Sequence, residues 1–66
     1  MIAITAEFKG RKYLVASDFT CFHTAEMAGW EFKRSHPKAS VHLADRQAHV
    51  DNCLSLAEFQ EAYFSA

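Results

Sequence analysis

Hydrophobic and polar residues alternate with a period of two at the start of the chain, which is the pattern of β-strands. The segment Ile2–Phe8 shows this alternation, and Lys12–Ser17 repeats a β-rich pattern after the dipeptide Lys9-Gly10. Because Gly10 can adopt the backbone of a tight turn, we predict a β-hairpin with a two-residue connection. That connection sets three cross-strand pairs: Glu7 with Lys12, Ala6 with Tyr13 and Ile4 with Val15. It also gives the hairpin an apolar face made of Ile2, Ile4, Ala6, Tyr13 and Val15.

After Asp18 the alternation stops, and the segment Thr24–Ser35 contains good helix formers. Thr24 is a suitable N-cap, and Pro37 restricts the preceding His36, so we predict a helix that ends near His36. At about 100° per residue, one narrow face of this helix is small and apolar and should pack on the sheet. This face consists of Ala25, Ala28, Gly29 and Phe32, whereas Met27, Trp30 and Arg34 fall nearly opposite.

The remaining chain predicts one β-rich region and a second helix. The segment Val41–Val50 is either a second hairpin around Asp45-Arg46-Gln47 or one strand followed by a loop. Ser55 and Glu58 form a capping-box pattern, and the helix that they start should run to the end of the chain. Its apolar face consists of Leu56, Phe59 and Tyr63.

These elements predict an α+β fold: a small two-layer domain with an antiparallel sheet and two helices in the order β-β-α-β-(β)-α. The length of 66 residues fits a single domain over 1–66. With 50% hydrophobic and 14% aromatic residues, the composition is the reverse of that of disordered chains. A short chain of this kind leaves little room for an elaborate catalytic cavity.

Charge and targeting signals narrow the functional classes. Seven Lys and Arg against eight Asp and Glu give a net charge of −1, so overall charge favours neither a strongly basic nucleic-acid binder nor an acidic DNA mimic. The N-terminal segment lacks the pattern of a signal peptide, and no apolar run is long enough to span a membrane. We therefore expect a cytoplasmic protein with reduced cysteines.

Two thiols and two imidazoles could formally make a tetrahedral zinc site: Cys21, His23, His49 and Cys53. Their spacing does not match the paired ligands of known zinc sites, so we expect no metal and no cofactor. If the second hairpin forms, His42 and His49 would face each other across it and could respond to pH. The alternative for both histidines is an ordinary exposed position on the sheet.

Catalysis has little support in the sequence. Cys21 and His23 could in principle be a nucleophile and its base, but no third residue orients them and no pocket is indicated. The two glycines do not make a phosphate-binding loop, and paired carboxylates are absent. We therefore expect a protein that is not an enzyme.

Two surfaces remain as candidates for binding. Basic residues cluster at the first turn and near the end of the first helix and could form a strip for nucleic acid, with Tyr13 available to stack on bases. This strip consists of Lys9, Arg11, Lys12, Lys33, Arg34 and Lys38. The same clusters are also expected simply because charges keep edges soluble and cations suit a helix C-terminus.

The second surface is the helix face of Met27, Trp30 and Arg34, which are residue types enriched at interface centres. Either the C-terminal helix or the segment Phe19–Phe22 covers this face internally, or it binds a partner. Because so short a domain cannot easily cover both faces of one helix, we expect Trp30 to be partly exposed.

In size, in the hairpin-helix-strand order and in the stretch from Thr24–Ala28 through His36–Val41, the chain resembles small accessory proteins of phages and mobile elements. Anti-CRISPR proteins are one such group. The resemblance implies a stoichiometric inhibitor that occupies a binding surface of a bacterial defence complex. We expect this inhibitor to act in the cytoplasm of a bacterial host, as a monomer or a homodimer. The sequence thus favours a protein-binding module whose partner is a host protein or nucleoprotein complex, and its alternative is a small nucleic-acid-binding regulator.

Overall fold

The computed structural model describes residues 1–65, which form a small α+β domain. Three strands and two α-helices follow one another in the order β-β-α-β-α, with one short 3-10 helix, η1, before the last helix. The elements are β1 (Ile2–Phe8), β2 (Arg11–Phe19), α1 (Phe22–Ser35), β3 (Ser40–Ala44), η1 (Gln47–His49) and α2 (Leu56–Ser65). The predicted fold class is therefore confirmed, and the predicted single domain is consistent with one shared core.

The sheet is antiparallel with the strand order β2-β1-β3. The turn at Lys9-Gly10 joins β1 to β2, and both residues have positive φ, 52° and 78°, as a type I′ hairpin turn requires. The predicted pairs of Glu7 with Lys12 and Ala6 with Tyr13 are confirmed.

The predicted pair of Ile4 with Val15 is wrong, because Ile4 lies opposite Ala16. The register shifts twice along the hairpin, and β2 has 9 residues against 7 in β1. One extra residue falls at Val15, and the second irregularity includes Asp18, whose φ of 71° is unusual for a residue other than glycine. A two-residue turn determines register only as far as the first bulge.

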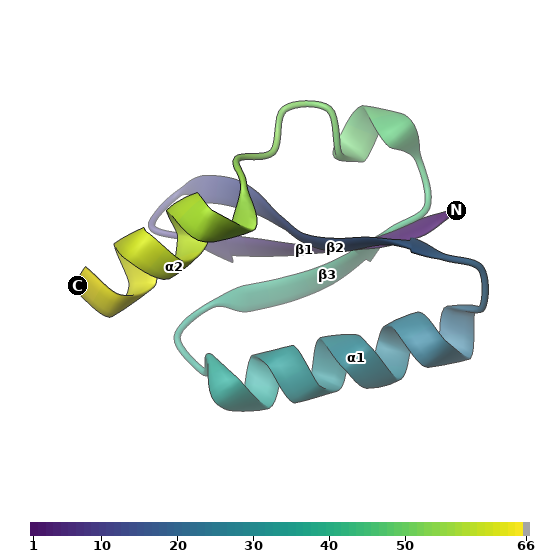
Figure 1. The fold of residues 1–66 in the computed structure, drawn as a ribbon, viewed down its shortest axis with the longest axis horizontal. Helices are drawn as coiled ribbons and strands as arrows, with labels where there is room; N and C mark the ends of the chain where they lie inside the picture. Colours follow the sequence, from purple (N-terminus) through teal and green to yellow (C-terminus); the bar gives the residue numbers. More distant parts are fainter. Residues whose placement is uncertain (66) are drawn as a thin grey trace.

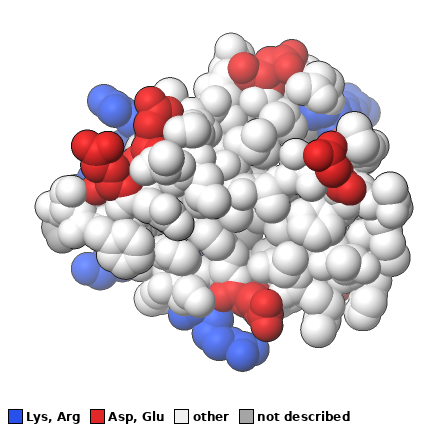
Figure 2. Space-filling model, in the orientation of Figure 1, with Lys and Arg blue, Asp and Glu red and all other residues white. Residues whose placement is uncertain are grey.

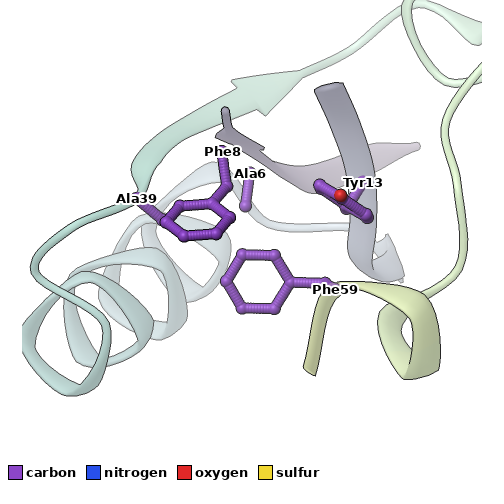
Figure 3. Close-up of a cluster of buried hydrophobic side chains, with 5 residues drawn as sticks. All are labelled: Ala6, Phe8, Tyr13, Ala39 and Phe59. Atoms are coloured by element: carbon purple, nitrogen blue, oxygen red, sulfur yellow. The ribbon is translucent and has the colours of Figure 1, made fainter. Parts of the chain in front are cut away.

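One face of the sheet packs against both helices. Phe59 of α2 is completely buried and lies edge-on to the rings of Phe8 and Tyr13, with centroids 6.2 and 5.3 Å apart. Figure 3 shows Phe59 among the other side chains of this cluster, which are Ala6, Phe8, Tyr13 and Ala39. Leu56 and Tyr63 are half-buried against the same cluster, which confirms the predicted apolar face of α2. Residue 66, to which that helix was expected to run, lies outside the described residues.

The opposite face of the sheet is crossed by the connection from β3 to α2. Figure 1 shows α1 on one side of the sheet and this connection, with η1, on the other. Leu54 then forms a parallel bridge to Tyr13: its carbonyl accepts from the Leu14 amide at 2.8 Å, and its amide donates to the Lys12 carbonyl at 2.9 Å. The connection therefore covers part of the outer edge of β2 before α2 returns to the helical face.

A second hairpin does not form in Val41–Val50, so the alternative of one strand followed by a loop is correct. The strand ends at Ala44, and Gln47–His49 make a turn of 3-10 helix. The segment around Asp45 lacks the glycine that would reverse the chain tightly. His42 and His49 consequently do not pair across strands, although both line a shallow hollow above Thr5.

Candidate partner-binding site

The side of α1 that turns away from the sheet carries large exposed side chains. Met27 is 57% and Trp30 66% exposed, and Arg34 is also exposed. On the other side of the helix Ala25 and Gly29 are buried, and Ala28 and Phe32 are half-buried. The predicted division of the helix into a packed and an outward face is confirmed, as is the partial exposure of Trp30.

Neither of the two segments considered as internal cover lies over Trp30. The C-terminal helix places Phe59 against Phe32 on the inner side of α1, with ring centroids 5.3 Å apart. Phe22 is itself 58% exposed at the start of α1. Within residues 1–65 the outward face of α1 is therefore open.

The start of α1 differs from the prediction. The helix begins at Phe22, two residues before Thr24, and Cys21 is its N-cap residue with extended φ and ψ of −116° and 126°. The amide of Ala25 donates to the Cys21 carbonyl at 3.1 Å and so closes the first turn. Thr24 instead lies inside this turn, where its backbone amide and hydroxyl interact with Cys21. A favourable N-cap residue is thus not always the residue at which a helix starts.

A hollow lies beside Trp30, between α1 and the edge strand β3. Its volume is about 370 Å³, and its walls come from Glu26, Gly29, Trp30, Lys33 and Val41–Leu43. Gly29 faces the strand: a Cβ at this position would make ordinary van der Waals contacts, 3.6 Å from Leu43 Cδ2 and 3.7 Å from Val41 Cγ1. The aromatic side chain of Trp30 therefore stands next to a surface depression with apolar walls.

Lys33 connects the end of α1 to the start of β3. Its Nζ donates to the carbonyl of Ala39 at 2.6 Å and to the carbonyl of Pro37 at 3.1 Å. These bonds hold the ammonium group beside the hollow and use two of its three donors. Lys33 is thus in part a structural residue of the α1–β3 connection rather than a freely mobile cation of the basic strip.

The fold brings the remaining basic clusters to one end of the molecule. The turn with Lys9 follows Phe8, which packs in one cluster with Ala39, the neighbour of Lys38. Arg11 lines a second hollow together with Glu58 and Glu61, so acidic side chains stand beside the basic ones. On the face that Figure 2 shows, the charged groups are separated around the rim, with Lys and Arg interrupted by Asp, Glu and uncharged surface.

Tyr13 cannot serve the predicted strip as a stacking platform. Only 2% of its surface is exposed, and its ring packs against Phe59 in the core. The expectation that Tyr13 could stack on bases is therefore wrong. The side chain points inward because it faces the same side of the sheet as Ala6, its cross-strand partner.

The cysteines and histidines are not assembled into a metal centre. In residues 1–65 no three side chains of His, Cys, Asp or Glu come together in a group that could hold a metal ion. Cys21 and His23 lie at the start of α1, whereas the Cys53 thiol donates to the His49 carbonyl at 3.5 Å in the connection before α2.

Cys21 has a distinct chemical property at the start of α1. The backbone amide of Thr24 favours its thiolate and, with the Thr24 hydroxyl and the His23 amide, lowers the pKa of Cys21 from its usual value near 9. The side chain is exposed. The exposed thiol is therefore ionised at a lower pH than that of an ordinary cysteine.

Sequence reasoning missed a cluster of aromatic rings around His36. Its ring stacks on Phe32 at 4.2 Å and meets Phe59 and Tyr63 edge-on at 5.4 and 4.9 Å. The Nδ1 atom lies 3.1 Å from the Phe32 carbonyl at the helix end. The one available signal was the spacing of Phe32 and His36, four positions apart on one helix face.

These features define a small α+β domain with an antiparallel three-stranded sheet, two helices and an open aromatic face on α1. Neither helix is long and apolar enough to cross a membrane, for the part of the chain that the structure describes. Comparison with known proteins finds no matching family model, no significantly similar curated protein and no significantly similar solved structure.

Proposed function

We propose that this chain is a non-enzymatic protein-binding module that occupies a surface of a host protein or nucleoprotein complex. One observation carries the proposal: Trp30, 66% exposed, stands with Met27 and Arg34 on the outward face of a helix whose inner face fills the core. Trp, Met and Arg are enriched at interface centres, and truncating such an aromatic anchor typically costs about 2 kcal/mol or more of binding.

The shape of this region supports a protein partner. Trp30 presents its ring on the outward side of α1 together with Met27, so the ring can pack against apolar surface of a partner. Arg34 supplies a cation at the periphery, where charge steers association more than it adds affinity. By its resemblance to anti-CRISPR-like accessory proteins, the partner would be a bacterial defence complex whose binding surface this chain blocks in the cytoplasm.

The alternative function is nucleic-acid binding through the basic residues. It is favoured by the position of Lys9 and Lys38 at the same end of the domain. Against it stand the burial of Tyr13, the internal bonds of Lys33 and the carboxylates beside Arg11. The two functions differ in salt dependence, because phosphate contacts weaken steeply as salt rises and an apolar protein interface does not.

The test is affinity capture from bacterial lysate with the immobilised chain, followed by mass spectrometry of the retained proteins. The wild type should retain a defined partner that resists elution by salt, and Trp30→Ala should lose it. Phe64→Ala is the matched control, since Phe64 is also a highly exposed aromatic residue, 71% exposed, but belongs to α2. Equal retention by Trp30→Ala and the wild type, or release by moderate salt with nucleic acid in the eluate, would overturn the proposal.

A further inference from the structure

The outer edge of β3 is an unprotected sheet edge. In the sheet order β2-β1-β3 the other edge strand, β2, is partly paired with Leu54, whereas within residues 1–65 no strand or bridge pairs with the outside of β3. Proteins commonly protect such edges with Lys, Pro, bulges or a covering loop. The segment Ser40–Ala44 contains no proline and no Asp, Glu, Lys or Arg, and its register with β1 is continuous. This edge is suited to pair with another strand.

The sequence of β3 is compatible with pairing to itself. In an antiparallel pair centred on His42, Val41 of one copy lies opposite Leu43 of the other, on both sides of the two-fold axis. Both side chains belong to the α1 side of the sheet, because they lie opposite Ala6 and Ile4 of β1 and contact the Gly29 position. Self-pairing would therefore add two apolar cross-strand contacts beneath the helices.

The two charged residues of α1 beside the hollow are compatible with the same two-fold symmetry. Glu26 and Lys33 both line it and are separated by seven positions, about 10 Å along the helix. Their midpoint falls between Gly29 and Trp30, and Gly29 faces the two residues that flank His42, because a Cβ at this position would lie 3.6 Å from Leu43 Cδ2 and 3.7 Å from Val41 Cγ1. Because α1 and β3 run in opposite directions (Figure 1), an axis through His42 places Glu26 of one copy opposite Lys33 of the other.

We propose that two copies of this chain associate through their β3 strands into one continuous antiparallel sheet, with the α1 helices side by side. The centre contains Val41 and Leu43 of both copies, and two Glu26–Lys33 pairs flank it. Such a two-fold interface is self-complementary, as dimers of identical chains require. The inference goes beyond the proposed function, because Met27 and Arg34 stay on the outward side of α1 and each dimer presents them twice.

The experiment is sedimentation equilibrium of the purified chain over a concentration series from micromolar to millimolar, with far-ultraviolet circular dichroism to verify folding. The wild type should sediment as a dimer at the upper concentrations. Glu26→Lys should raise the dimer dissociation constant about tenfold or more, because it replaces two attractive pairs by two repulsive ones. Glu31→Lys is the matched control: it makes the same charge change at an exposed position of α1 that does not line the hollow, and its dissociation constant should stay at the wild-type value.

A second variant tests the strand pairing itself. His42→Glu places two carboxylates opposite each other at the axis and should also weaken the dimer, since like charges directly opposite destabilise a strand pair. A wild type that remains monomeric throughout the series, or equal effects of Glu26→Lys and Glu31→Lys, would overturn the proposal. Failure here is distinguishable from failure of the proposed function: Arg34→Glu should reduce capture of the host partner and leave the dimer intact, so each property has its own variant.

Discussion

At the scale of single residues, the Lys9-Gly10 turn sets the strand pairs next to it, whereas Phe59 of α2 covers the ring of Tyr13. The positive φ of Gly10 and the cross-strand pair of Glu7 with Lys12 could both be predicted from the two-residue turn alone. Tyr13 shows the limit of such reasoning: its ring was correctly placed on the apolar face, but its burial depends on Phe59, which lies far along the chain. Whether Tyr13 lies on the surface or in the core could be decided only once the structure placed Phe59 of α2 against it.

Cys21 provides a prediction at this scale. Its alkylation by iodoacetamide should reach half of its maximal rate at a lower pH in the native chain than in the chain unfolded in urea. The reason is that the Thr24 amide, the Thr24 hydroxyl and the His23 amide lower the pKa of Cys21 only when α1 is formed, so the reactive thiolate appears at lower pH. Mass spectrometry of the modified peptide measures both profiles. Coinciding profiles would mean that the helix start does not act on the thiol.

At the scale of elements, the sequence predicted regular segments well and irregular ones poorly. Two elements are each recognisable from a local sequence pattern: β1 from the alternation of Ile2–Phe8, and the start of α2 from the capping box at Ser55. No such local pattern marks the bulge at Val15, the early start of α1 at Phe22 or the 3-10 turn of η1. The face of α1 that meets the sheet was predictable because small residues recur on it with helical spacing.

The capping box gives the second prediction. The Ser55 amide donates to Glu58 Oε2 at 2.9 Å, and the Glu58 amide donates to Ser55 Oγ at 3.2 Å. Ser55→Ala should therefore lower the free energy of unfolding by about 1 kcal/mol, a fall of about 4–8 °C in the melting temperature. Ser65→Ala, at the other end of α2, is the control and should melt with the wild type. Equal melting of all three chains would rule out a stabilising cap.

The two faces of α1 give the third prediction. Phe32 is half-buried against Phe59 and His36, so Phe32→Ala should cost about 3 kcal/mol of stability, the lower end for a phenylalanine in a core. Trp30→Ala removes an exposed side chain and should change stability by about 0.5 kcal/mol or less. Urea titrations of both variants measure the difference. Comparable losses would place Trp30 in the core and would move the search for an interface to the basic residues.

At the scale of the whole molecule, two packing requirements determine how this short chain folds. Both helices must cover the same apolar face of the sheet, and the connection through η1 must cross the other face to bring α2 back. Phe59 then fills the space between the elements, which leaves the outer face of α1 and the edge of β3 uncovered. The exposed face was predictable from helical spacing, but the free edge and its hollow were not, because strand order is a property of the assembled sheet.

The most direct test of the proposed function is calorimetric titration of the protein identified by affinity capture with three chains: the wild type, Trp30→Ala and Phe64→Ala. We predict that Trp30→Ala weakens binding by about 2 kcal/mol or more, about thirtyfold in the dissociation constant, while Phe64→Ala binds like the wild type. Circular dichroism should show all three chains equally folded. Unchanged affinity of a folded Trp30→Ala chain, or equal weakening by Phe64→Ala, would contradict the assignment of the α1 face as the binding surface.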